Sequence, residues 1–112
     1  MGEYKVRITD QAKEHLNLIK SYIVSEINEP QTAKKMLALL KENMKNLSFM
    51  PYRIKCIDEQ PWGSLGFRKI RVKNYYIYFW VEEESKIVHI IAVVYTRMDQ
   101  KKQLGKMNDR IK

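Results

Sequence analysis

Three strand-like runs follow one another between Gly66 and Asp99, and they limit the folds open to this chain more than any other feature. The runs extend from about Phe67 to Val72, from Tyr75 to Glu82 and from Lys86 to Thr96, and β-branched and aromatic residues dominate all three. A two-residue turn, Lys73-Asn74, and a short acidic segment connect them. Because such short connections join neighbouring antiparallel strands, we predict a three-stranded meander.

The two longer runs carry enough apolar residues to be buried on both sides of a sheet. In the last run, alternation predicts two apolar faces, Ile87, Ile91 and Val93 on one side and Val88, Ile90, Ala92 and Val94 on the other. We therefore expect a central strand. In the middle run the better core candidates are Tyr75, Ile77, Phe79 and Val81. On its other face we expect Tyr78 and Trp80 to pack, whereas Tyr76 either packs or lines a site.

The first half of the chain predicts one strand and two amphipathic helices. Residues 4–8 alternate between apolar and polar side chains, as in a half-buried strand. One helix is predicted from Asp10 to about Ile27, and a second from Pro30 to shortly before Pro51. Apolar residues recur every three or four positions in both helices, so the two should form an antiparallel hairpin.

The remaining segments have weaker patterns. Residues 48–65 show no periodicity, and we expect a loop there. After Asp99, which suits a helix N-cap, the apolar residues Leu104, Met107 and Ile111 predict a short, weak terminal helix.

These elements predict a single domain spanning residues 1–112, of the α+β class. Its order is strand, helix, helix, three strands and a final short helix. We expect two layers, with the helical hairpin packed on a small, twisted and mostly antiparallel sheet. The first strand should complete one edge of that sheet, and the last strand of the meander should be central.

Composition excludes several classes of protein and suggests an anionic partner. A single cysteine, Cys56, rules out an internal disulfide framework, and no spacing suits a metal site or a cofactor-binding loop. No run is long enough to span a membrane, so we expect a cytoplasmic protein without a membrane partner. The net charge of +8 comes from two segments, residues 53–73 and 97–112, each with 6 cations and 2 anions. Such clusters suit nucleic acid or an acidic protein segment.

Four stretches of the chain carry a family resemblance. They are ITDQAKEHLNLIKSYI, the ending Leu47 to Pro51, GFRKIRVKNYYIYFWV and IIAVVYTRMD. In order, spacing and total length they resemble the RelE/ParE superfamily, the toxins of bacterial type II toxin–antitoxin modules. The resemblance implies a small twisted sheet backed by a helical hairpin, which agrees with the residue pattern. It also implies a cognate antitoxin as partner, and an acidic segment would suit both cation clusters.

Members that cleave messenger RNA at the ribosome use basic residues on the first meander strand and a cation with a nearby aromatic residue at the end of the third. The resemblance therefore implies such roles for Lys69 and Arg71, with Arg68 as a one-residue alternative in register. At the end of the third strand it implies the same for Arg97 and Tyr95. Guanidinium and ammonium groups are suited to bind phosphate.

Tyr76 stands where the second meander strand of such nucleases carries an arginine. Cleavage through a ribose 2′-hydroxyl needs a base, an acid and cations, and the chain is rich in cations. For proton transfer the candidates are Tyr76 and Tyr95. The two histidines, His15 and His89, are interpreted as structural. Contacts to RNA or the ribosome are expected from Arg53, Arg68, Lys101 and Lys102. For Arg68 the alternative is a structural arginine that spans the sheet edge, because it shares the side of Ile70 and Val72.

Three hypotheses follow from the resemblance. The first is a toxin acting as a metal-independent endoribonuclease, without cofactor, on ribosome-bound messenger RNA. The second is a ParE-like poison of DNA gyrase that binds its target without cleaving RNA, and the departure at Tyr76 favours it. The third is a degenerate member that keeps only antitoxin binding.

Overall fold

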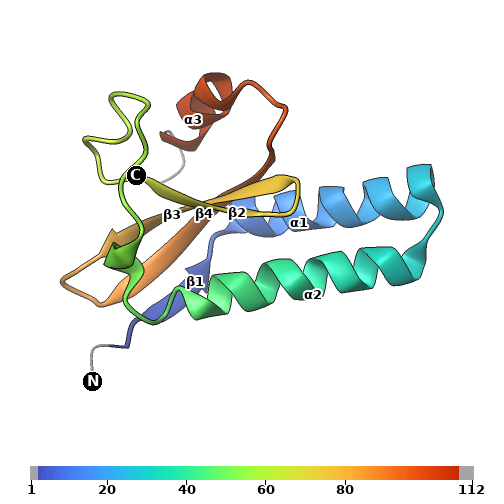
Figure 1. Cartoon of the computed structure of the whole chain (residues 1–112), viewed down its shortest axis with the longest axis horizontal. Coiled ribbons are helices and arrows are strands. Elements are labelled where there is room, and N and C mark those ends of the chain that lie inside the picture. Colours follow the sequence, from blue (N-terminus) through green and yellow to red (C-terminus); the bar gives the residue numbers. More distant parts are fainter. Residues whose placement is uncertain (1–2, 109–112) are drawn as a thin grey trace.

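The computed structural model describes residues 3–108 and contains the predicted elements in the predicted order. They are β1 (Lys5–Ile8), α1 (Asp10–Tyr22), a π-helical turn (Ile23–Ile27), α2 (Pro30–Asn46), a 3-10 turn (Pro51–Arg53), β2 (Arg68–Val72), β3 (Tyr75–Glu82), β4 (Ile87–Tyr95) and α3 (Gln100–Asn108). In Figure 1, α1 and α2 form a hairpin along one face of the sheet, and α3 lies on the opposite side. The predicted α+β class is confirmed. Ile111 of the predicted last helix lies outside the described residues.

Local signals explain where the helices begin and end. The Thr9 hydroxyl caps the start of α1, and its continuation ends at Asn28, whose left-handed backbone (φ 60°) stops the helix. Pro30 lies in the first turn of α2, where its missing N–H has no helical partner. A side-chain oxygen of Asp99 accepts a hydrogen bond from the N–H of Lys102 in α3 at 3.2 Å. The predicted N-cap of the last helix is therefore confirmed.

The four strands form one sheet in the order β1-β4-β3-β2. β2, β3 and β4 are antiparallel neighbours, and β1 is parallel to β4. The central place of β4 and the edge place of β1 were both predicted. Beyond the end of β1, side chains of α1 cover the edge of β4: Gln11 Nε2 donates to the Ile91 carbonyl at 3.2 Å, and His15 Nδ1 accepts from the Val93 N–H at 3.1 Å. His15 thus has a structural partner.

A β-bulge corrects the predicted alternation in β4. Tyr78 pairs with Ala92 but Phe79 pairs with Ile90, so Ile91 is an extra residue on β4. Strict alternation is therefore wrong beyond Ile90, because one extra residue reverses the direction of those that follow. Facing the hairpin are Val88, Ile90 and Val93, and facing away from it are Ile91, Ala92 and Val94.

Each face of the sheet has its own apolar core. On the side of α1 and α2, the hairpin face, the predicted core residues of β3 are in place, since Ile77, Phe79 and Val81 are buried and Tyr75 packs against them. On the other side, the α3 face, Tyr78 is fully buried with Leu104 and Met107 of α3. Tyr76 and Trp80 are half-buried against this second core. Packing of Tyr78 and Trp80, as predicted, is confirmed.

None of the helices within residues 3–108 is both long and apolar enough to cross a membrane.

Candidate nucleic-acid interface

Lys69 lies at the centre of the predicted site, on the α3 face. It pairs with Tyr78 across the β2–β3 ladder, so its side chain lies between two tyrosines of β3. The ammonium nitrogen is 4.2 Å from the centre of the Tyr76 ring and 5.8 Å from that of Tyr78. Such contacts between a cation and aromatic faces hold the ammonium group in place while it stays partly exposed.

Glu59 provides a carboxylate at this site that sequence reasoning missed. Its Oε2 lies 3.7 Å from the Lys69 ammonium nitrogen, and both side chains are 24% exposed. At this separation the two groups form an ion pair without a close hydrogen bond. Among residues 3–108 the Glu59 carboxylate accepts no hydrogen bond, so its oxygens are available to a ligand.

The loop between residues 54 and 66 holds Glu59 against the sheet. The Ile57 N–H donates to the Phe67 carbonyl at 2.9 Å, and the Gly63 N–H donates to the carbonyl of Glu59 at 2.8 Å. A side chain at Gly63 would place its Cβ 2.1 Å from the Ile57 carbonyl oxygen, so this tight turn requires glycine. No local pattern could have predicted the contact between Glu59 and Lys69, because it joins a loop residue to a strand residue ten positions away.

Arg71 and Tyr76 complete the group on the α3 face. They are paired directly across β2 and β3, so their side chains project from the same side as Lys69. Arg71 is exposed and uses its Nε to donate to the carbonyl of Lys73 at 3.0 Å, which leaves its two terminal nitrogens without a partner among the described residues. The predicted residues Lys69, Arg71 and Tyr76 therefore lie together.

The predicted pair Tyr95 and Arg97 is divided. Tyr95 pairs with Tyr75 across the β3–β4 ladder, and the two rings pack edge to face at 5.9 Å, so Tyr95 lies on the hairpin face, opposite Tyr76. Arg97 follows the strand on an exposed turn and makes no ion pair with residues 3–108. The turn is next to the β2–β3 connection, because the Thr96 N–H donates to the Asn74 carbonyl at 2.9 Å.

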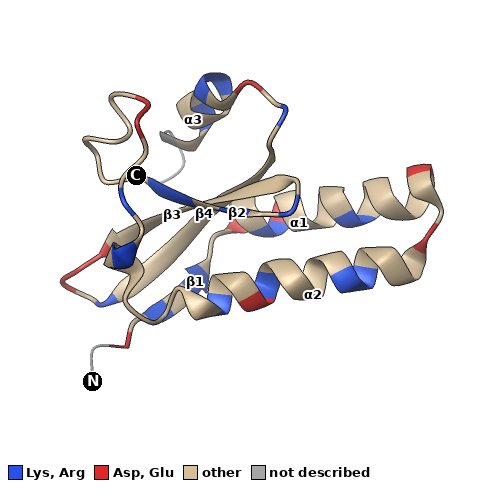
Figure 2. Cartoon of the chain, viewed as in Figure 1, with Lys and Arg blue, Asp and Glu red and all other residues tan. Residues whose placement is uncertain are grey.

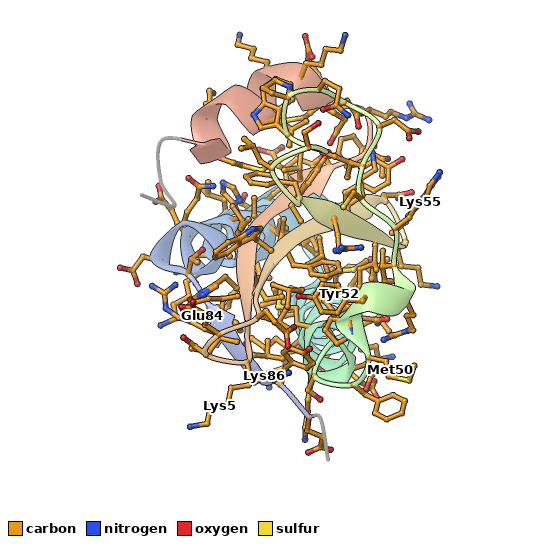
Figure 3. All side chains as sticks on the ribbon, turned by 90° about the vertical axis from the view of Figure 1, so that its left-hand side faces the viewer. Lys5, Met50, Tyr52, Lys55, Glu84 and Lys86 are labelled. Atoms are coloured by element: carbon orange, nitrogen blue, oxygen red, sulfur yellow. The ribbon has the colours of Figure 1, made fainter. Side chains whose placement is uncertain are left out.

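Two predicted RNA contacts, Arg53 and Arg68, have partners within the protein. Arg53 donates to the carbonyls of Phe49 and Met50, in the connection that follows α2. Arg68 lies on the hairpin side of β2, donates to the carbonyl of Ile54, and stacks 4.9 Å above the Tyr52 ring. Figure 3 shows Tyr52 and Met50 in the lower half of the molecule, away from α3 at the top.

The other two predicted contacts, Lys101 and Lys102, are exposed on the first turn of α3. Gln100 attaches this turn to the sheet: the Tyr78 hydroxyl donates to Gln100 Oε1 at 2.6 Å, and Gln100 Nε2 donates to the Met98 carbonyl at 2.7 Å. Burial raises the pKa of Tyr78, with nearby Glu59 adding to the effect, so its hydroxyl remains a hydrogen-bond donor at neutral pH.

A second polar group on the same face was also missed. His89 Nδ1 accepts from Arg7 Nη1 at 3.0 Å, its Nε2 lies 2.8 Å from a Glu82 oxygen, and its ring stacks on Trp80. Both ring nitrogens are thus occupied, which supports the structural interpretation of His89. The residues Arg7, His89 and Trp80 are lateral neighbours on three adjacent strands.

A pocket on the surface contains none of the predicted catalytic or RNA-binding residues. It has a volume of about 310 Å³ and lies between α1 and α3, lined among others by Gln11, His15, Leu18, Gln103 and Met107. Within residues 3–108, no three histidine, cysteine or acidic side chains are grouped so that they could hold a metal ion.

Comparison with known proteins gives one family match. Residues 6–100 match the family described as the ParE toxin of the type II toxin–antitoxin system parDE. No curated protein shows a significant match.

Several solved structures share the fold. The chain superposes on a chain of the chromosomal ParDE toxin–antitoxin system from P. aeruginosa with a TM-score of 0.71 and 19% identity, covering 87% of this chain and 100% of that one. For a mutant of the E. coli toxin RelE in the free state the TM-score is 0.65 and the identity 17%, and the match covers 98% of this chain and 99% of that one. For a chain of the RelBE2 toxin–antitoxin complex from Mycobacterium tuberculosis the TM-score is 0.59 and the identity 22%, and the match covers 85% of this chain and 93% of that one.

Proposed function

The chain belongs to the ParE toxin family of type II toxin–antitoxin systems, and from this premise we propose that it inhibits growth by cleaving messenger RNA on the ribosome. The observation that carries the proposal is the group formed by Lys69, Arg71 and Tyr76 on the α3 face, with the Glu59 carboxylate 3.7 Å from Lys69. These side chains comprise the cations, the proton donor and the base that cleavage through a 2′-hydroxyl requires.

The proposed reaction is a transfer within the RNA strand. The ribose 2′-oxygen attacks the neighbouring phosphorus and its proton passes to Glu59, while Lys69 and Arg71 bind the phosphate oxygens. As the bond from phosphorus to the 5′-oxygen breaks, that oxygen takes the hydroxyl proton of Tyr76. The products are a 2′,3′-cyclic phosphate and a 5′-hydroxyl. Arg97 adds a phosphate contact from its turn.

The test is induced expression followed by mapping of the 5′ ends of messenger RNA. Wild type should give codon-phased cuts, and Tyr76→Phe should lower the cleavage rate by about 10²-fold or more, the usual contribution of a general acid. Tyr22→Phe, an exposed tyrosine of α1, is the matched control and should cut normally. Loss of cleavage in Tyr95→Phe but not in Tyr76→Phe would contradict the assignment.

A second acidic pair gives a further control. Glu59→Gln should reduce cleavage, whereas Asp58→Asn should not, because the Asp58 side chain is 92% exposed and lies 4.0 Å from exposed Lys55. Equal cleavage by wild type and Glu59→Gln would remove Glu59 from the mechanism.

A second candidate function is a non-cleaving poison of DNA gyrase. It is favoured by the match to the ParE family and by Tyr76, which occupies the position of the arginine expected in a nuclease. Induction of the DNA-damage response without codon-phased cuts would replace the first proposal with this one. Under either function we propose an acidic antitoxin as partner, consistent with the toxin–antitoxin complexes among the structural neighbours.

A further inference from the structure

Both tight connections of the meander contain a lysine with a left-handed backbone. The φ angle is 55° at Lys73, between β2 and β3, and 56° at Lys86, between β3 and β4. Residues other than glycine and asparagine are unfavourable in this region, because their Cβ crowds the backbone. Each lysine therefore calls for a reason that offsets the strain.

Lys86 has such a reason within the protein. Its ammonium group pairs with Glu83 and lies 5.1 Å from the centre of the Tyr4 ring. Lys73 has none that residues 3–108 provide, since its exposed side chain makes no ion pair, hydrogen bond or ring contact there.

Arg71, on the strand that leads into this turn, and Arg97, from the turn after β4, lie at the end of the sheet where Lys73 is found. Arg71 Nε donates to the Lys73 carbonyl at 3.0 Å, and the Thr96 N–H donates to the Asn74 carbonyl at 2.9 Å, which brings the turn carrying Arg97 alongside. Figure 2 shows cations on both of these turns, whereas acidic residues mark the β3–β4 turn at the opposite end of the sheet.

The three side chains are exposed, and within residues 3–108 none is paired with a carboxylate. We propose that Arg71, Lys73 and Arg97 form a cluster that binds the phosphate backbone of a nucleic acid, and that Lys73 occupies its strained position for this contact. The inference shares Arg71 and Arg97 with the proposed function, but it concerns binding and requires no cleavage.

Phosphate fits this cluster better than other anions do. Each of the two guanidinium groups can bind two phosphate oxygens through its terminal nitrogens, and the lysine adds a third positive charge at the same end of the sheet. A nucleic-acid strand repeats its negative charges at regular intervals, so several cations at one end of the sheet can contact neighbouring phosphates, and binding releases counterions in proportion to the contacts made.

The experiment compares Lys73→Gly with Lys86→Gly in fluorescence anisotropy. The probes are a 2′-O-methyl RNA strand, which cannot be cleaved through its 2′-oxygen, a DNA duplex of the same sequence, and a poly-glutamate peptide, each titrated at several salt concentrations. Lys73→Gly should reduce the slope of log affinity against log salt by about 0.7 for single-stranded RNA or about 0.9 for duplex DNA. Lys86→Gly should leave the slope unchanged.

Stability provides an independent readout. Lys73→Gly should raise Tm by about 4 °C because it relieves the left-handed strain, so stability should rise while binding falls. Lys73→Gln keeps the strain and should lose only the binding. A reduced slope on RNA alone, on duplex DNA alone or on both supports the proposal and identifies the source of the phosphate.

An unchanged slope on both nucleic acids, or a loss confined to the poly-glutamate probe, would overturn the inference. Failure of the proposed function looks different: wild type would bind the uncleavable RNA with the expected salt dependence and yet leave ribosome-bound messenger RNA uncut.

Discussion

At the scale of single residues, neighbouring cations of the sheet have different partners, and these partners decide what a substitution changes. Arg68 is bonded to the Ile54 carbonyl and stacked on Tyr52, whereas Arg71, three residues on, keeps its terminal nitrogens exposed. The first therefore stabilises the fold and the second is available to a ligand.

We accordingly expect Arg68→Met to lower the free energy of unfolding by about 2 kcal/mol, the usual contribution of a hydrogen bond from a charged donor. Arg71→Met should change it by less than about 0.5 kcal/mol, as is usual for exposed positions. Urea unfolding of both variants measures the difference. Equal stability of the two variants would mean that Arg68 does not stabilise the fold and is available for the predicted RNA contact.

Glu83 predicts how stability depends on pH. Hydrogen bonds from Lys86, Tyr4 and Tyr52 lower the pKa of this carboxyl to about 2. Since the folded pKa lies below the unfolded value of about 4.3, Glu83 stabilises the fold fully above that pH, and its contribution is lost as pH falls toward 2.

The prediction is tested by comparing wild type with Glu83→Gln in urea at pH 7, 4 and 2. Wild type should be the more stable at pH 7, and the two midpoints should converge at pH 2. A difference that stays constant across this range would show that the Glu83 carboxylate is not what stabilises this turn. Glu84→Gln, which alters a neighbouring exposed acid in the same turn, serves as the control.

At the scale of elements, α3 combines strong anchoring with weak intrinsic stability. Leu104 and Met107 are buried against the α3 face, yet Gly105 lies between them and disfavours the helix. A Cβ built at Gly105 meets no atom within 4 Å, so alanine fits without a clash.

Gly105→Ala should therefore stabilise α3 by about 0.5–1 kcal/mol. Hydrogen exchange of the α3 amides measures this directly, and their protection should rise by about two- to five-fold while that of β3 stays unchanged. Unaltered protection in α3 would mean that this helix opens only together with the whole sheet.

At the scale of the whole molecule, charge is distributed unequally between the two ends of the sheet. The β3–β4 turn combines Lys86 with acidic residues, whereas the end with Arg71, Lys73 and Arg97 has no ion pair among the residues described. Such a region of positive charge attracts an acidic partner at long range, and added salt weakens this attraction.

If the cognate antitoxin is acidic, its association rate with this chain should fall by about tenfold between 0.05 and 0.5 M salt. Stopped-flow mixing measures the rate, and the triple variant Arg71→Gln, Lys73→Gln, Arg97→Gln should lose most of the salt dependence. The matching triple variant of Lys13, Lys20 and Lys34, on the helical hairpin, should keep it.

The arrangement of elements was predictable because the signals are local. Periodicity identified the helical hairpin, and the apolar run ending at Val94 identified β4 as the central strand. Burial on both faces requires an interior place in the sheet, which β4 shares with β3. The bulge at Ile91 was not predictable, since an extra residue in one strand is defined by the register of its partner.

The sequence by itself determined the elements, their order, the charged segments and the family, because each depends on residues close together in the chain. Only the tertiary structure decided which cations are free and which are bonded. It placed Glu59 beside Lys69, separated Tyr95 from Tyr76 on opposite faces, and brought Arg97 next to the Lys73 turn. These relations arise from strand register and loop packing, which join residues that no spacing along the chain connects.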